Sequence, residues 1–474
     1  MEFTEFLRGA LAQYEQKVLE IAERADATGM APAEFRRMVA GLKAAGNELS
    51  LAAFTALAVR QDGVEEQIVH QGSLHRYKLT AEKEWLTPWG KTQVARRVYQ
   101  PDRGGPCAVP LDEGCGMVDR FMTPDVERVT SLMGARLTPG EVAQTLVEVF
   151  PDGPSTTAIQ HVLEKVGQQA EDHAAAVETA LSEQAPLNLD GDTLVVGWDG
   201  TNMPLRQSAP HRGRPPERPG VRDQEQAATA WKEAGVGMVS VYQTPLDPLT
   251  EPAERVDVRY YARVPERKMA RLVGSVVEQT EAAVQAGSFT HKVFLADGAR
   301  EIWRTVQQQE VFADFTLILD FYHAAEHLST ASEWIFGKGA SEAKHWYNRW
   351  RRKLLEEPGA ATALVRSVHR YCARCRKGTA RHKALTREAG YFRANAKKMD
   401  YATYRAAGIP ISSGPVEAAC KTIVGHRLKR SGMRWSLAGA QRILNLRVPL
   451  QSKRWDAFWK WYLQPTDQLT TVRL

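Results

Sequence analysis

The pattern of apolar and polar positions divides the chain into helical and strand-forming stretches. Near the N-terminus, apolar residues recur at the spacing of an amphipathic helix: Leu7, Leu11, Tyr14, Val18 and Ile21. From residue 73 the pattern changes to short runs rich in β-branched and aromatic residues, joined through Pro88-Trp89-Gly90, which predicts two strands and a turn. Helical patterns return at residue 124 and again at residue 330.

These changes of pattern predict six regions. They are a helical N-terminal region at 1–72, a small β-rich element at 73–123, a helical region at 124–185, the first part of an α/β core at 190–329, a helical basic insertion at 330–405, and a completion of the core with basic C-terminal helices at 406–474. A chain of 474 residues is too long for one ordinary domain, so several domains are expected.

The order of elements predicts the type of core. Three β-rich runs form an antiparallel meander: 193–199, 235–242 and 256–263. A helix at 266–286, a strand at 291–296, another helix and a strand at 315–320 follow. Periodicity alone indicates a mixed α/β domain. By analogy, the order βββ-α-β-α-β is that of a ribonuclease-H-like domain, with a mixed five-stranded sheet and flanking helices.

Composition bounds the protein class and compartment. Hydrophobic residues make up 43% of the chain and charged residues 25%, which is typical of a soluble globular protein. No apolar run approaches the length of a membrane span, and the first residues lack the pattern of a secretory signal. Five cysteines indicate a reducing compartment. We therefore expect a cytoplasmic protein without a membrane partner.

The net charge of +6 conceals a strong asymmetry. Residues 344–454 contain 26 Lys and Arg but five Asp and Glu, and residues 421–454 contain nine basic residues and no acidic one. Such a block favours binding to a polyanion, and nucleic acid is the obvious candidate. The lysines and arginines of 421–454 would then hold DNA phosphates. The alternative is a solvated basic face without a partner.

A candidate helix-turn-helix lies in the second helical region. Residues 137–146 resemble its first helix, 151–154 would be the turn, and Ser155 would cap the second helix. The two helices are acidic overall, so a packing unit or a dimer contact explains the same pattern.

Two cysteines have zinc-like spacing, Cys372 and Cys375, and His369 and His382 lie nearby. The stretch has a helical pattern with arginines and lysines throughout, so we do not expect zinc there. Cys107 and Cys115 lack a CxxC partner, so we do not expect a zinc knuckle at that loop either.

Three acidic motifs carry the candidate chemistry. Asp199 and Asp297 each end a hydrophobic strand-like run and precede a glycine, and Glu417 lies in the first turn of a helix that starts at Gly414-Pro415. Carboxylate oxygens are the ligands that Mg²⁺ prefers, and Mn²⁺ could replace it. We expect all three to be catalytic metal ligands in a two-metal site for phosphodiester chemistry. Each acid alone is more simply explained as a turn Asp or a surface Glu.

The residues around Glu417 extend this prediction. Five cations follow it and are predicted to bind DNA: Lys421, Arg427, Lys429, Arg430 and Arg434. A salt bridge between Glu417 and Lys421 is the alternative. Asp320 and His323, at a strand-to-helix junction, are predicted to support the site by orienting one another or by binding a phosphate. A buried histidine bonded to a helix-start carboxylate explains the same pair.

Several of these strings resemble bacterial insertion-sequence DDE transposases of the ISKra family. The similar strings are Gly197-Trp198-Asp199-Gly200-Thr201, Leu295-Ala296-Asp297-Gly298-Ala299, Asp320-Phe321-Tyr322-His323, Gly414-Pro415-Val416-Glu417-Ala418-Ala419-Cys420-Lys421 and Arg430-Ser431-Gly432-Met433-Arg434-Trp435. The resemblance covers roughly residues 75–450. It departs from the family in the region of Cys107 and Cys115, where a cysteine-rich knuckle is often found.

The resemblance implies a function and partners. Asp199, Asp297 and Glu417 would be the triad, and 330–405 an insertion before the glutamate. The protein would bind double-stranded DNA, both transposon ends and target, and use Mg²⁺ for cleavage and strand transfer. A homodimer or higher oligomer is implied, because two ends must be paired. The alternatives are a ribonuclease-H-like structure-specific nuclease and a non-catalytic DNA-binding protein derived from a transposase.

Overall fold

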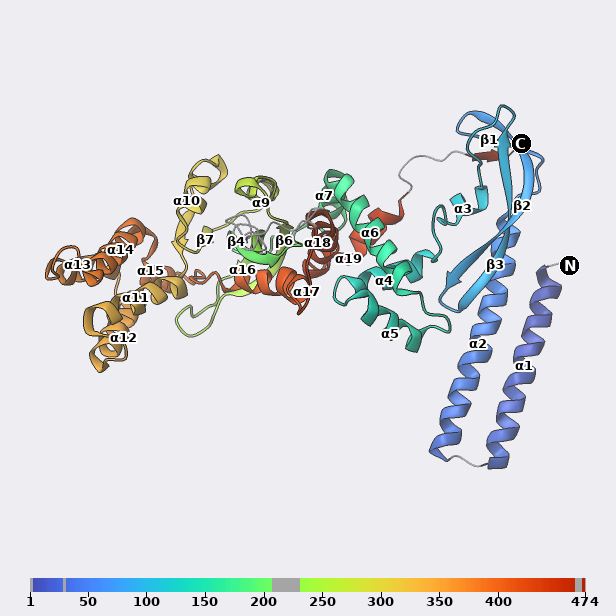
Figure 1. The fold of residues 1–474 in the computed structure, drawn as a ribbon, viewed down its shortest axis with the longest axis horizontal. Coiled ribbons are helices and arrows are strands. Elements are labelled where there is room, and N and C mark those ends of the chain that lie inside the picture. The colour runs from blue at the N-terminus through green and yellow to red at the C-terminus, as the bar shows by residue number, and fades with distance from the viewer. Residues whose placement is uncertain (1–2, 29–30, 207–230, 465–470, 474) are drawn as a thin grey trace, which may run out of the picture. The chain divides into compact units, whose positions relative to one another are not determined.

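The computed structural model of the chain describes residues 3–28, 31–206, 231–464 and 471–473. The chain forms two compact units (Figure 1): Met1–Val177 with Asp456–Leu474, and Glu178–Trp455. The C-terminal residues thus belong to the same unit as the N-terminal ones. No described helix combines the length with the apolar stretch that a bilayer crossing requires.

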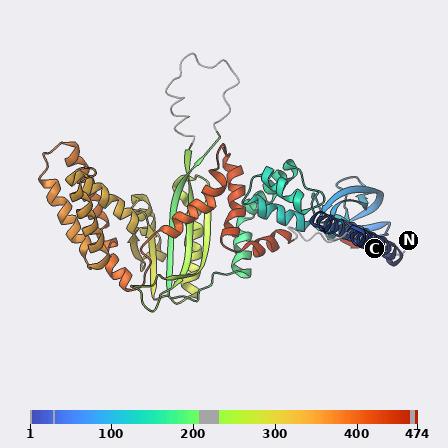
Figure 2. The same cartoon turned by 90° about the horizontal axis from the view of Figure 1, so that it is seen from below.

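The first unit begins with two long helices that pack along one another (Figures 1 and 2), as the N-terminal pattern predicts: α1 (Phe3–Thr28) and α2 (Pro32–Gln61). An antiparallel sheet in the order β3-β2-β1-β9 follows. Its strands are β1 (Gln67–His70), β2 (Ser73–Thr87), β3 (Gly90–Pro101) and β9 (Thr471–Arg473). The predicted hairpin is therefore present, with Trp85 and Val94 buried in its core.

Short helices complete the first unit: α3 (Pro110–Gly114), α4 (Pro124–Gly134), α5 (Pro139–Val149), α6 (Thr156–Asp172), α7 (Ala174–Gln184, which continues into the second unit) and α19 (Trp455–Leu463, which starts at the unit boundary). Thr138 and Glu141 form a capping box at the start of α5. The Ser155 hydroxyl accepts from the N–H of Ala158 at 3.2 Å, so the predicted cap of α6 is confirmed. DNA recognition by α5 and α6 stays a prediction.

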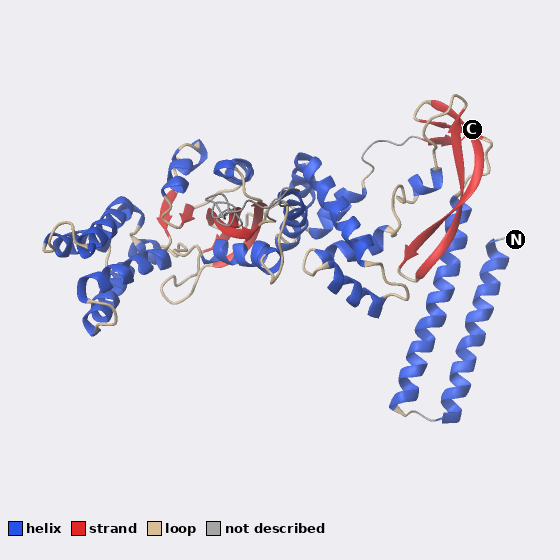
Figure 3. Ribbon diagram, viewed as in Figure 1, coloured by secondary structure: helices blue, strands red, loops and turns tan. Residues whose placement is uncertain are grey.

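The second unit is built on a mixed five-stranded sheet with flanking helices (Figure 3). Its strands are β4 (Thr193–Pro204), β5 (Trp231–Gln243), β6 (Glu254–Arg263), β7 (His291–Ala296) and β8 (Thr316–Leu319). The order is β6-β5-β4-β7-β8: β4, β5 and β6 form an antiparallel meander, and β7 and β8 continue parallel to β4. All five predicted strands are present, but β4 ends later and β5 starts earlier than predicted.

Four helical elements separate β6, β7 and β8 along the chain: η1 (Arg267–Met269), α9 (Ala270–Ala286), α10 (Arg300–Gln307) and η2 (Glu310–Phe312). Two strand glycines let α9 approach β5 closely. A Cβ on Gly235 would lie 2.6 Å from Leu272, and one on Gly237 would lie 2.4 Å from Val276. Helix α9 therefore packs directly on the antiparallel half of the sheet.

Five helices and a 3-10 turn occupy residues 321–406 and pack together beside the β8 edge of the sheet (Figure 2). They are α11 (Phe321–Phe336), α12 (Ser341–Glu356), α13 (Ala360–Ala373), α14 (Ala380–Asn395), η3 (Ala396–Lys398) and α15 (Tyr401–Ala406). The helical character predicted for 330–405 is thus present. Cys372 contacts the hydroxyl of Thr386, and Cys375 contacts the carbonyl of Tyr371.

The chain then returns to the sheet through α16 (Gly414–Ala419), a π-helical segment η4 (Cys420–Gly425), α17 (His426–Leu428) and α18 (Leu437–Gln451). Arg447 of α18 is 3% exposed. It donates from Nε to the carbonyl of Ile423 at 2.5 Å and from Nη2 to the carbonyl of Thr422. The Arg447 guanidinium therefore donates hydrogen bonds to backbone carbonyls of η4, where the α-helical hydrogen-bond pattern is interrupted.

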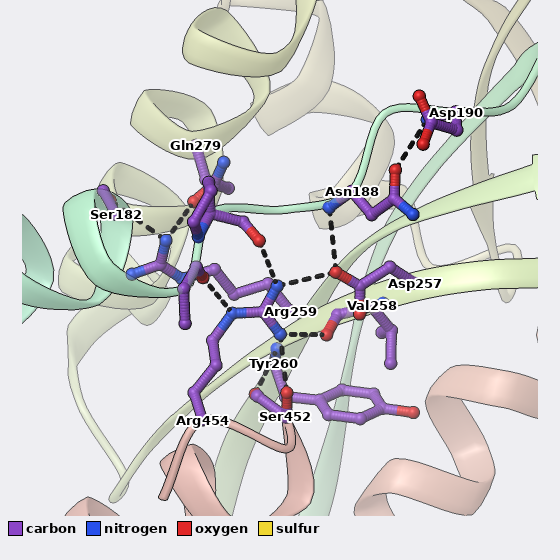
Figure 4. Close-up of polar contacts among 12 residues, drawn as sticks. Ser182, Asn188, Asp190, Asp257, Val258, Arg259, Tyr260, Gln279, Ser452 and Arg454 are labelled. Atoms are coloured by element: carbon purple, nitrogen blue, oxygen red, sulfur yellow. Dashed lines mark hydrogen bonds and ion pairs between the residues drawn. The ribbon is translucent and has the colours of Figure 1, made fainter. Parts of the chain in front are cut away.

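Two further buried arginines brace the sheet where the chain enters and leaves the second unit (Figure 4). Arg259 of β6 is 2% exposed, pairs with Glu178 and donates to Gln279 at 2.8 Å. Arg454 is 4% exposed and pairs with Asp257 at 2.7 Å. It also donates to the carbonyl oxygens of Ala185, Pro186 and Val258. Each charge is compensated inside the protein, as burial requires.

Candidate active site

Asp199 lies where β4 extends beyond its parallel neighbour. The parallel pairing of β4 with β7 ends at Val196 and Phe294. Trp198 is buried against Phe294, with ring centroids 4.6 Å apart, and the next residue along the strand presents its carboxylate on the opposite face. The prediction that the strand ends at Asp199 is wrong, because β4 continues to Pro204 while paired with β5.

Asp297 is the first residue after β7, as predicted. Its Oδ1 accepts from the backbone N–H of Ala299 at 3.0 Å, just before α10 begins at Arg300. This short turn orients the carboxylate at the end of a central strand.

Glu417 is presented by α16, which starts at Gly414 as predicted. The Ser413 hydroxyl donates to Glu417 Oε1 at 3.1 Å. Ser413 also donates its backbone N–H to the buried carboxylate of Asp320. Glu417 therefore takes its hydrogen bond from the residue before its own helix, and that residue is fixed to the strand-to-helix junction after β8.

The three carboxylates are coupled electrostatically around Asp199. Burial raises the pKa of Asp199 to about 6, against the effect of the hydrogen bond from the Gly200 N–H at 2.7 Å. The nearby charges of Asp297 and, less strongly, Glu417 raise the pKa of Asp199 further. Three separate elements thus bring three acids close enough for like charges to influence one another.

The carboxylates of Asp199, Asp297 and Glu417 do not form a ready-made metal-binding cluster in the described part of the chain. Within the described ranges, no three His, Cys, Asp or Glu side chains are grouped tightly enough to hold a metal ion. Each carboxylate instead accepts from a local donor: Gly200, Ala299 or Ser413. A donor set of carboxylate oxygens suits Mg²⁺ or Mn²⁺.

A pocket of about 480 Å³ opens beside Asp199 and Asp297. Three further acids line it, Glu233, Glu266 and Glu301. Pattern reading missed Glu233 because the predicted strand starts at residue 235, whereas β5 starts at Trp231. The register of the β4–β5 ladder, which places Glu233 opposite Asn202, reveals its position.

Cys420 also reaches the site, and the sequence analysis did not single it out. Its Sγ lies 3.7 Å from Asp199 Oδ2. Burial and the charge of Asp199 raise the pKa of this thiol, so it remains protonated and donates to the carboxylate. Cys420 follows Glu417 by three residues, and this spacing on a helix predicts that both point to one side.

The predicted DNA-binding cations fall into two groups. Lys421 and Arg434 are exposed, Arg430 is half-buried, and half-buried Lys429 donates to the Thr201 hydroxyl on β4. Arg427 is 2% exposed, and its guanidinium lies over the Trp435 ring, 5.2 Å from the centroid. Arg427 is therefore a packing residue and is not retained as a phosphate contact. The expectation that every cation of 421–454 holds phosphate is corrected in the same way for buried Arg447 and Arg454.

Asp320 and His323 contact one another differently from the prediction. Asp320 is fully buried, and its Oδ1 accepts from the backbone N–H of His323 at 2.6 Å as the N-cap of α11. The imidazole of His323 is partly exposed, with Nδ1 3.7 Å from Glu326. The two side chains therefore do not orient one another. Asp320 acts on the backbone instead, at both His323 and Ser413.

Residues 358–399 of the insertion expose many positively charged side chains and no carboxylate. Between residues 358 and 399 the only acid is Glu388, which is 1% exposed and bonded to His327 and Arg387. The exposed cations of this stretch are Arg366, Arg370, Arg374, Arg376, Lys377, Arg381, Lys383, Arg387, Arg393 and Lys397. We call this the α13–α14 surface. No exposed carboxylate of its own segment competes with an anionic partner there.

Comparison with known proteins gives little. No protein-family model and no curated protein sequence matches the chain. Among solved structures, the chain is similar to the Drosophila P element transposase strand transfer complex, with 9% identity, a TM-score of 0.25, and coverage of 76% of this chain and 85% of that chain. A likeness at this level establishes neither a shared fold nor a shared function.

Proposed function

We propose that the protein is a DDE transposase, similar to the ISKra group, that binds the ends of an insertion sequence and catalyses metal-dependent DNA cleavage and strand transfer. The observation that carries this proposal is that Asp199 and Asp297 line one pocket, and that Cys420, three residues after Glu417, lies with its Sγ 3.7 Å from Asp199 Oδ2. Coupled acids in a partly buried site are expected where cations bind, because a structural role would not require three like charges together.

The fold that we propose is ribonuclease-H-like. Supporting it is the mixed five-stranded sheet in the order β6-β5-β4-β7-β8, with its first acid on the central strand and its second directly after the neighbouring parallel strand. The third acid comes from a helix that packs on β4 and β5 after a helical insertion. In a sheet with parallel strands, ligands bind outside the carboxyl ends of those strands, which is where Asp297 lies.

Asp199, Asp297 and Glu417 would hold Mg²⁺, or Mn²⁺ in its place. A divalent ion, when bound, supplies Lewis-acid assistance to phosphodiester cleavage and joining. The chain's own residues set up the site for it. Cys420 donates to one oxygen of Asp199, and Ser413 donates to Glu417. The carboxylate of Asp320 fixes Ser413 in place by accepting a hydrogen bond from the Ser413 backbone N–H.

Double-stranded DNA, as transposon end and as target, is the proposed partner. Near Glu417, the cations that we propose to contact phosphates are Lys421, Lys429, Arg430 and Arg434, of which Lys421 and Arg434 are exposed. The α13–α14 surface would add contacts farther along the same DNA. Binding that rests on these groups weakens as salt rises, since phosphate neutralisation releases counterions. Two ends must be paired for transposition, so we propose that the protein acts as a homodimer or higher oligomer at the nucleoid.

The test is a cleavage and joining assay on DNA that carries the sequences flanking this gene, with Mg²⁺ or Mn²⁺. We expect the wild-type protein to cut and join, Asp199→Asn to do neither, and the matched exposed variant Asp190→Asn to behave as wild type. Unchanged cleavage by Asp199→Asn would refute the triad. Cleavage without joined product would favour a structure-specific nuclease. Salt-sensitive binding without cleavage would favour a non-catalytic DNA-binding protein.

A further inference from the structure

One side chain of the insertion, Tyr391 of α14, reaches the candidate active site. Gly298, directly after Asp297, has no room for a side chain. An added Cβ would lie 2.6 Å from the Tyr391 hydroxyl oxygen and 2.8 Å from its Cε2. The phenol therefore packs directly against the turn that presents the second carboxylate, although the two segments are far apart in the chain.

The Tyr391 ring is held in place by stacking on the imidazole of His327. It lies on the imidazole of His327, with centroids 3.6 Å apart and an interplanar angle of 16°. Nδ1 of His327 is 2.6 Å from Oε2 of Glu388, which is 1% exposed. Glu388 and Tyr391 are three residues apart on α14, so both face the imidazole of α11. Since α11 is capped by Asp320 directly after β8, this arrangement connects the insertion to the sheet.

The Tyr391 hydroxyl is buried, and it has no hydrogen-bond partner among the described residues. A buried polar group without a partner costs stability, and phenylalanine would fill the same space without that cost. Burial and the charge of Asp297 raise the pKa of Tyr391, so the hydroxyl keeps its proton at neutral pH. It is therefore an unused donor beside a carboxylate that we assign to metal binding.

We propose that Tyr391 is a positioning residue for Asp297. Its ring fixes the Asp297-Gly298 turn. Its hydroxyl donates to the Asp297 carboxylate once that carboxylate turns away from Ala299 toward a bound divalent cation. The role of the hydroxyl rests on the proposed function, because it needs the cation, whereas the role of the ring does not.

The experiment compares Tyr391→Phe and Tyr391→Ala in the full chain, with Tyr371→Phe as the matched control. Tyr371 is another insertion tyrosine, and its ring packs against Phe336 and Trp346 instead. We expect Tyr391→Phe to melt at the same or a higher temperature than wild type but to need about tenfold more Mn²⁺ for half-saturation. Tyr391→Ala should also speed amide hydrogen exchange at residues 297–300, which Tyr391→Phe leaves protected.

Each part of the proposal has its own contrary result. Wild-type Mn²⁺ affinity in Tyr391→Phe would overturn the role of the hydroxyl. Unchanged exchange at 297–300 in Tyr391→Ala would overturn the role of the ring. A wild-type protein that binds no Mn²⁺ would overturn the proposed metal site and the hydroxyl's role together. Hydrogen exchange needs neither metal nor DNA, so it still decides the role of the ring.

Discussion

The buried carboxylate of Asp320 accepts a hydrogen bond from the backbone N–H of Ser413, which follows it by 93 residues. The helical insertion lies between these two residues, so the bond joins the chain before the insertion to the chain after it. A second bond, from the N–H of Phe321 to the carbonyl of Ile411 at 3.0 Å, reinforces the junction. Because Ser413 holds Glu417, this junction places the third acid next to a sheet from which it is distant in sequence.

We expect Asp320→Ala to lower the free energy of unfolding by about 2–5 kcal/mol, since two backbone N–H groups at a buried position lose their acceptor. Asp320→Asn keeps one acceptor oxygen and should cost less. Urea denaturation measures both. The control is Asp400→Ala, because Asp400 accepts a solvent-exposed hydrogen bond from the N–H of Gly359 at 3.1 Å, and its loss should cost less than about 1 kcal/mol. Equal losses at the two positions would contradict the special role of Asp320.

Buried and exposed arginines should affect different measurements. Arg447→Gln removes donors to the carbonyls of Thr422 and Ile423 and should lower stability by about 2–4 kcal/mol. Exposed Arg434→Gln should leave stability within about 0.5 kcal/mol of wild type. It should instead reduce the slope of log affinity against log salt by about 0.9. A lower salt slope in a folded Arg447→Gln would show that Arg447 contacts DNA after all.

The α13–α14 surface should contribute a separable part of DNA affinity. Arg366 and Arg370 lie one turn apart on one side of α13, and Arg374 follows Arg370 by four residues, directly after the helix ends at Ala373. Their replacement by glutamine together should lower the salt slope by about two to three. Arg352→Gln is the control, because Arg352 is near Glu356. A triple variant with the wild-type slope would remove this surface from the DNA-binding account.

Asp199 should make the metal-free protein more stable in mild acid. Its pKa of about 6 in the folded protein exceeds the ordinary value of 3.8. The folded state therefore binds a proton that the unfolded chain releases. This contribution is fully present below about pH 4 and is lost as the pH rises through about 6. With metal removed by chelator, we expect Asp199→Asn to reduce the difference in melting temperature between pH 5 and pH 7.5.

The repulsion between Asp199 and Asp297 also predicts how an Asp297 substitution and a bound metal change the melting temperature. Asp297→Asn removes a like charge, so it should lower the pKa of Asp199 and raise the melting temperature of the metal-free protein at pH 7.5. Mg²⁺ should stabilise the wild-type protein at pH 7.5 and do so less at pH 5, where Asp199 holds a proton. A metal-free Asp297→Asn protein that melts below the wild type at pH 7.5 would contradict the assumed repulsion.

The strands of the second unit and the start of the Glu417 helix could be predicted because local patterns encode them. The extension of β4 past Asp199 could not, since the polar run from Asp199 to Asn202 looks like a turn until β5 pairs with it. The count of basic residues wrongly predicted that Arg427 binds DNA. A count of charges does not show that the Arg427 side chain is buried and packs on Trp435. The contact of Tyr391 with Gly298 joins distant segments and has no local signature.

The most direct test of the account is Mn²⁺ binding at pH 7.5, measured by electron paramagnetic resonance on the wild-type protein and on Asp199→Asn, Asp297→Asn and Glu417→Gln. The account predicts that the wild type binds Mn²⁺ and that each substitution weakens binding at least about tenfold, since each removes one charged ligand of a shared site. Asp190→Asn should bind as the wild type does. Wild-type affinity in Glu417→Gln would contradict the claim that the three acids form one metal site.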